Sequence, residues 1–174
     1  FSSRRRHTRF RNVTGVQTCA LPIFGLMVAI ERPDLVKSLV AIGANYHYEC
    51  GLNLQIFDGN VNEEAKDKFA ARTGQPRDLL VEIIHKAHKV WASEPRITKS
   101  QLKKIKCPTL ILAGDDEPFS TEHTVSLYES IPNAQLSIVP GTSHAVLKEK
   151  PRLVKQILQD FYRDPSFQIG RAHV

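Results

Sequence analysis

The sequence predicts an α/β fold in which the strands of a parallel sheet alternate with flanking helices. Three short apolar runs, at 36–42, 109–114 and 136–139, are separated by segments whose apolar residues recur at helical spacing. Strands that alternate with helices in this way are typical of parallel sheets. The first run is apolar at nearly every position, which favours a strand covered on both faces. We therefore expect buried parallel strands with helices packed against them.

The first element is the end of an apolar helix at 25–30. Pro33 disfavours helical geometry at Arg32, so the helix is expected to stop there. The run LVKSLVAIGAN then predicts a strand over 36–42 that is bounded by Gly43.

Helices are predicted across the middle of the chain. Asn62 can cap a helix that runs through Arg72 with its side-chain oxygen. Two glutamates follow it in the first turn, where the helix dipole favours acids. The spacing of apolar residues predicts a second helix over 75–92 and a third, shorter one over 98–105.

Two further strands are predicted in the last third of the chain. Pro108 introduces TLILAG, a buried strand that ends in the acidic cluster DDE at 115–117. Ser120 or Thr121 can cap a helix that extends to about Ile131. The other strand is predicted over 136–139, and PGTSH at 140–144 is expected to be a loop.

A closing amphipathic helix is predicted over 152–161. It stands directly behind Pro151, and proline is favoured at the start of a helix because its fixed φ suits the first turn. This helix completes the alternation of strands and helices.

Composition limits the class of protein. With 174 residues, 41% hydrophobic and 24% charged, the chain fits one ordinary globular domain. No stretch approaches the roughly 20 apolar residues of a membrane-spanning helix, so no membrane partner is expected. Cys19, Cys50 and Cys107 are widely spaced and form no CxxC pair, which favours reduced thiols in a cytoplasmic protein over a disulfide framework or a zinc site. No metal and no cofactor is predicted.

The net charge of +6 comes from the two ends of the chain. Residues 1–23 hold five arginines and no acid, and Arg171 lies in the tail. The remainder has 18 Lys and Arg against 18 Asp and Glu. A basic footprint for nucleic acid is therefore confined to the ends, and no nucleic-acid partner is expected.

Both ends look foreign to the rest of the sequence. The leader 1–23 and the closing QIGRAHV resemble translated sequencing-adapter sequence, while an Arg-rich leader without acids could also be an organelle transit peptide. We interpret 1–23 as a non-native leader and 168–174 as a non-native tail.

Two strand ends carry groups of complementary chemistry. The second predicted strand leads into DDE and the third into GTSH. Ligands of parallel sheets gather at the carboxyl ends of the strands. His144 could take a proton from a nucleophile there, and a carboxylate could fix its tautomer and stabilise the imidazolium.

Three segments together carry a family resemblance: GLMVAIERPDLVKSLVAIGAN, CPTLILAGDDE and IPNAQLSIVPGTSHAVLKEKP. In this order and spacing, 24–161 resembles the C-terminal half of an α/β-hydrolase, a family whose triad runs nucleophile, acid, histidine. The resemblance implies that His144 is the catalytic base and that 62–105 forms a small helical cap over the site. The fold implied is a partial α/β-hydrolase fold.

The resemblance leaves two candidates for the triad acid. Counting forward from Gly114 gives Glu117, whereas counting back from EHT at 122–124 matches either Asp116 or Glu117. We favour Asp116, because Asp is the commoner choice in the family, and keep Glu117 as the alternative. Asp115 is expected to cap the next helix or to solvate the loop.

Other histidines receive simpler interpretations. His85 and His88 lie three apart on a predicted helix, but no third metal ligand is suitably spaced, so a solvated cap helix is favoured. His47 could line the pocket or pack among aromatic residues, and His123 is expected at the surface.

The sequence contains no G-x-S-x-G elbow, which the family uses to present its nucleophile. Cys19 stands where an elbow nucleophile would be expected, but Gln17 and Leu21 replace the small residues that the sharp turn requires. We interpret the position of Cys19 as a coincidence and not as a nucleophile.

The resemblance implies a division of the chain into core helix and strand at 24–45, helical cap at 46–106, and a C-terminal core with the acid and histidine loops at 107–167. Its function would be to hydrolyse a small, apolar carboxylic ester through a nucleophile-acid-histidine triad, once a nucleophile is supplied; this chain is expected to be inactive.

Alternatives remain open at this point. The missing nucleophile would separate esters from amide, C–C, epoxide or haloalkane substrates. A non-catalytic module that binds a small ligand on the same fold is the alternative function.

Overall fold

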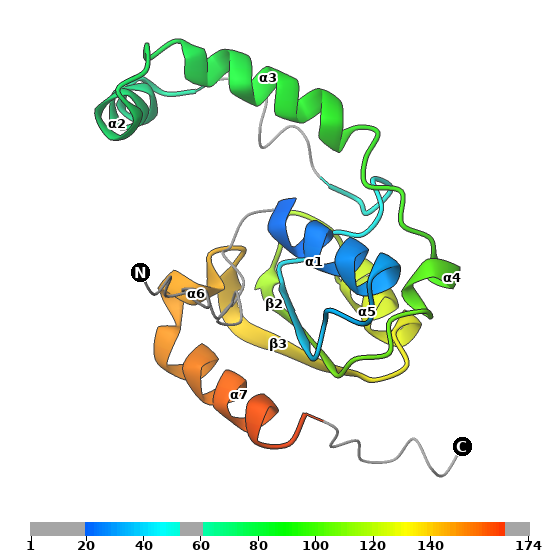
Figure 1. Ribbon diagram of the computed structural model, residues 1–174. Helices are drawn as coiled ribbons and strands as arrows, with labels where there is room; N and C mark the ends of the chain where they lie inside the picture. The colour runs from blue at the N-terminus through cyan, green and yellow to red at the C-terminus, as the bar shows by residue number, and fades with distance from the viewer. Residues whose placement is uncertain (1–19, 53–60, 166–174) are drawn as a thin grey trace, which may run out of the picture.

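A computed structural model describes residues 20–52 and 61–165 (Figure 1). In this part of the chain three strands form one parallel sheet in the order β1-β2-β3. The strands are β1 (Leu39–Ile42), β2 (Thr109–Asp116) and β3 (Ala134–Ser143). The predicted α/β fold with a parallel sheet is confirmed. The predicted tail and residues 1–19 of the predicted leader lie outside the described residues.

Seven helices accompany the sheet in the described ranges. They are α1 (Ala20–Glu31), α2 (Glu63–Thr73), α3 (Leu79–Trp91), α4 (Lys99–Leu102), α5 (Thr121–Ser130), α6 (Val146–Glu149) and α7 (Pro151–Arg163).

Helices cover both faces of the sheet. On one face, Leu26 of α1 and Leu127 of α5 pack with Ala41 and Ile111 of the strands. On the other face, α6 and α7 pack against alternate strand residues, and this second cluster contains Ile42, Leu110, Leu112, Val139, Val146, Val154 and Phe161. Because successive strand side chains point to opposite faces, apolar residues at every position fill both layers.

Side-chain caps fix where several helices begin. Asn62 accepts a hydrogen bond from the backbone N–H of Ala65 at 2.8 Å, and Ser120 accepts one from that of His123 at 3.2 Å. Thr98 begins α4 with a capping box. These oxygens satisfy N–H groups that the first turn of a helix leaves without a partner.

Several predicted boundaries were wrong, since β1 begins at Leu39 instead of Val36 and α4 ends at Leu102 instead of Ile105. The segment 140–144 was expected to be a loop, but β3 continues to Ser143. Between the pairs Gly114–Val139 and Asp116–Ser143, β3 holds two more residues than β2, and pairing resumes beyond this irregularity. The helix predicted over 75–92 begins at Leu79, because Gly74 ends α2 with φ of 68° and the chain turns again before α3.

Helices α2 and α3 project away from the sheet in Figure 1. Neither contains a buried residue. Helix α4 differs, because its Leu102 is fully buried in the core beside α1 and α5. Within the described residues, no helix has the length and apolar character needed to cross a membrane.

Candidate active site

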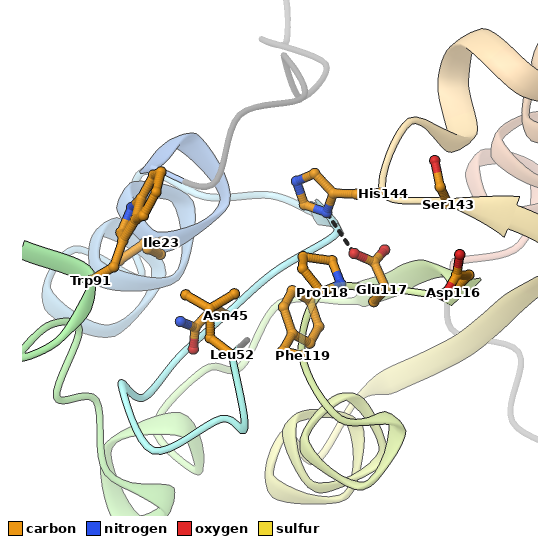
Figure 2. Close-up of a pocket in the computed structure, with 10 residues that line it drawn as sticks. All are labelled: Ile23, Asn45, Leu52, Trp91, Asp116, Glu117, Pro118, Phe119, Ser143 and His144. Carbon is orange, nitrogen blue, oxygen red and sulfur yellow. Dashed lines mark hydrogen bonds and ion pairs between the residues drawn. The ribbon is translucent and has the colours of Figure 1, made fainter. Parts of the chain in front are cut away.

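The structure brings His144 and Glu117 into contact at the carboxyl end of the sheet. Nδ1 of His144 lies 2.5 Å from Oε2 of Glu117, as the dashed line in Figure 2 marks. Glu117 follows the end of β2 and His144 follows the end of β3, two strands that are neighbours in the sheet. A contact this short between an imidazole and a carboxylate is a charge-assisted hydrogen bond when either group is ionised.

The Glu117 carboxylate is held on both oxygens. Oε1 accepts a hydrogen bond from the backbone N–H of Gly114 at 3.0 Å, while Oε2 contacts His144. The Glu117 side chain is only 4% exposed, and that of His144 is 28% exposed. The backbone of Gly114 thus fixes the carboxylate, whereas the imidazole is open to the pocket.

The carboxylate bonded to His144 is that of Glu117, although Asp116 was the favoured candidate from the sequence. The side chain of Asp116 is exposed and lies on the far side of Glu117 from the imidazole (Figure 2). The register shift between β2 and β3 pairs the Asp116 backbone with Ser143. The next residue, Glu117, then lies beside the imidazole ring of His144. Of the two candidates, the geometry therefore favours Glu117.

Asp115 braces the end of β3, which leads to the histidine. Its carboxylate accepts hydrogen bonds from the backbone N–H groups of Gly141 and Thr142 at 2.8 and 2.9 Å. These donors hold the pKa of the Asp115 carboxyl below its ordinary value. Asp115 does not cap α5, whose N-cap is Ser120; its carboxylate is exposed and joins β2 to β3.

Glu149 also holds the end of β3. Its two carboxylate oxygens accept hydrogen bonds from the backbone N–H and the hydroxyl of Ser143, at 2.7 and 2.6 Å. These bonds, the hydroxyl one first, lower the pKa of Glu149. The residue directly before His144 is therefore fixed at both its backbone and its side chain.

An apolar pocket of about 410 Å³ opens beside the pair. Its lining comprises Ile23, Asn45, Leu52, Trp91, Asp116, Glu117, Pro118, Phe119, Ser143 and His144. Figure 2 shows Trp91 and Ile23 across the pocket from His144 and Glu117. The pocket thus places one polar pair against a largely apolar wall, which is the usual composition of a small-molecule site.

Most of the apolar lining was not predicted from the sequence. Leu52, Trp91 and Phe119 come from three separate segments, and only the fold brings them together. Trp91 lies within the helix predicted over 75–92, but no pattern indicated that it would line a pocket with His144. Asn45 lines the pocket, whereas His47 does not and instead stacks on a neighbouring tyrosine.

His123 was expected at the surface, and this was wrong. It is buried, its ring stacks on Tyr46 with centroids 4.2 Å apart, and its Nε2 accepts a hydrogen bond from the Tyr46 backbone N–H at 3.2 Å. Burial, with smaller contributions from His47 and Lys99, lowers the pKa of His123 to about 4. The ring is therefore neutral at physiological pH.

The remaining candidates lie away from the pair. His85 is exposed on α3, and His88 lies beside Trp91 with ring centroids 5.7 Å apart. Across the described ranges, no three His, Cys, Asp or Glu side chains are grouped as a metal site would require. Cys19 lies outside the described residues.

No family model matches the chain. Among curated proteins, it is 23% identical over 110 residues to a provisionally named 2-succinyl-6-hydroxy-2,4-cyclohexadiene-1-carboxylate synthase of Bacillus subtilis (strain 168), over 63% of this chain and 40% of the relative. It is 29% identical over 86 residues to the monoacylglycerol lipase ABHD6 of Mus musculus, over 49% of this chain and 24% of the relative. The chain therefore spans less than half the length of either relative.

Solved structures show the same fold. An α/β hydrolase, MGS-MChE2, from a lagoon-sediment metagenome of Mar Chica, Morocco, matches with a TM-score of 0.57 and 18% identity over 86% of this chain and 60% of its own. A thermophilic esterase matches with a TM-score of 0.63 and 19% identity over 84% of this chain and 64% of its own. The fold is a partial α/β-hydrolase fold.

Proposed function

We propose that this chain is the acid and base portion of an α/β-hydrolase that cleaves small, apolar carboxylic esters when a nucleophile is supplied. One observation carries the proposal: the contact between His144 and the buried carboxylate of Glu117 at the mouth of an apolar pocket. By itself this pair can orient an imidazole and stabilise its charge, but it cannot form an acyl intermediate.

In the proposed reaction, Glu117 accepts the Nδ1–H of His144 and leaves Nε2 to act as the base. A hydroxyl nucleophile gives its proton to Nε2 as its oxygen bonds to the ester carbonyl carbon. The imidazolium then returns the proton to the departing alcohol oxygen as the C–O bond breaks. Water then gives a proton to Nε2 as it attacks the acyl intermediate. The imidazolium returns that proton to the oxygen of the nucleophile, and the carboxylic acid is released.

The pocket and two of the relatives support an ester substrate. Leu52, Trp91 and Phe119 line the pocket and offer apolar contact to a substrate bound beside His144 and Glu117. A monoacylglycerol lipase and an esterase, by their names, act on esters. An apolar acyl group would gain about 25 cal/mol for each Å² of surface that it buries there.

We further propose that residues 46–106 act as a cap and that 24–45 and 107–167 form the core. Trp91 lies at the end of α3 and reaches the pocket, which supports a role for this segment in covering the substrate. Helix α4, at the end of the segment, packs in the core and would anchor the cap. We also propose the cytoplasm as its location, the compartment in which thiols such as that of Cys107 are kept reduced.

The test is to complete the chain and measure ester hydrolysis. The chain would be joined to the N-terminal part of a relative whose sequence contains G-x-S-x-G, and turnover of p-nitrophenyl butyrate measured beside the chain alone. We expect turnover from the joined protein and none from the chain alone. Circular dichroism would establish that the joined protein is folded.

Two results would count against the proposal. A folded, joined protein that binds the ester without cleaving it would favour the non-catalytic binding module. Turnover by the chain alone that disappears in Cys19→Ala would identify that cysteine as a nucleophile.

A further inference from the structure

Gly43 contacts His144 through its backbone. It directly follows β1, is buried, and has φ of +57°. Its N–H donates to the carbonyl of Leu112 at 2.8 Å, which fixes this backbone to β2. The position of Gly43 is therefore set by the sheet.

No side chain fits at this position while His144 stays in place. A Cβ atom on Gly43 would lie 2.6 Å from Cε1 and 2.8 Å from Nδ1 of His144, and 3.5 Å from Oε1 of Glu117. Carbon atoms in contact are ordinarily about 3.5 to 4.0 Å apart. The ring edge that faces Gly43 is the same edge that contacts Glu117.

We propose that Gly43 is a positioning residue for His144, because its bare backbone lets the imidazole reach the Glu117 carboxylate. Glu117 is held by Gly114 and has little freedom to follow a displaced ring. Any side chain at position 43 would push Nδ1 out of reach of Oε2. The function of this contact rests on the proposed function, but the contact itself can be tested without any turnover.

The test uses the full chain labelled with ¹⁵N at its histidine rings. A proton shared between Nδ1 and a carboxylate 2.5 Å away gives an NMR resonance far downfield of ordinary amide protons. We expect this resonance in the unchanged chain and its loss in Gly43→Ala. The matched control is Gly74→Ala, since Gly74 has φ of +68° but a Cβ atom added there would meet nothing within 4 Å.

A second comparison covers the case in which Gly43→Ala does not fold. Removing the ring in Gly43→Ala/His144→Ala relieves the clash, so the double variant should regain the helical circular dichroism signal. If it stays unfolded, or if a folded Gly43→Ala keeps the downfield resonance, the proposal is overturned. Neither result depends on ester hydrolysis, so each can be told apart from a failure of the proposed function.

Discussion

Asp116 and Glu117 are neighbours in sequence, but their carboxylates occupy different surroundings. Glu117 is held by Gly114 and His144, whereas Asp116 is exposed. Motif counting predicted that the acid lay at one of these two positions and that His144 lay opposite. Counting residues could not decide between the two acids, because the outcome depends on a register shift between β2 and β3 that the residue pattern does not reveal.

A buried histidine near the site should make stability depend on pH. The pKa of His123 is about 4 when folded, against an ordinary 6.5. As the pH falls from about 6.5 to 4, the unfolded chain binds a proton that folded His123 does not, so stability falls; below about 4 both states are protonated and this contribution stays constant. The loss is at most on the order of 3 kcal/mol.

Urea unfolding at several pH values would measure this effect. We expect His123→Phe to flatten the fall in stability between pH 6.5 and 4, whereas the exposed His85→Gln should leave it unchanged. An unchanged slope in His123→Phe would show that the ring is not buried in its neutral form.

The pocket wall also makes a prediction for a single residue. The chain has one tryptophan, Trp91, and it lines the pocket, so its fluorescence should report binding of a non-hydrolysable apolar ester analogue. Leu52→Ala should weaken binding about 3- to 10-fold, because it removes apolar contact area. Leu35→Ala serves as the control, since Leu35 is exposed and outside the pocket. Equal affinities in the two variants would remove Leu52 from the binding site.

Among the elements, the order of strands and helices and the starts of α2 and α5 followed from local rules. Asn62 and Ser120 cap helices as predicted, and Thr98 caps α4 although it was not predicted to do so. Helix α6 and the full length of β3 did not follow, because the α6 segment is only four residues long and β3 is extended by pairing with β2. Tertiary contacts, which a local pattern does not contain, decide such boundaries.

The helices α2 and α3 should open more readily than the core. Neither has a buried residue, although α3 has an apolar face, so little burial opposes local unfolding. Hydrogen exchange should therefore be faster in the amides of α2 and α3 than in those of β2. Equal protection in α3 and β2 would show that the apolar face of α3 is covered in solution.

At the scale of the whole molecule, apolar surface remains exposed along one side. Leu21, Phe24, Met27 and Val28 of α1 are all at least 41% exposed. In the described part of the sheet, β1 pairs with a strand on one side only. Exposed apolar patches and open strand edges both favour association.

We therefore expect the chain to self-associate as its concentration rises. Sedimentation velocity should show a growing average mass, and Phe24→Ser/Met27→Ser should shift association to higher concentration. Lys37→Ser, at an exposed polar position, is the control. A chain that stays monomeric at all concentrations would show that this apolar surface is too small to drive association.

We propose that His144 and Glu117 act together as the base and acid of an ester hydrolase. The most direct measurement is p-nitrophenyl butyrate turnover by the completed protein in three variants. His144→Ala should lose at least about 10³-fold in kcat and Glu117→Gln about 10²- to 10⁴-fold, while Asp116→Asn stays within about threefold. Full activity in Glu117→Gln together with a large loss in Asp116→Asn would contradict the claim.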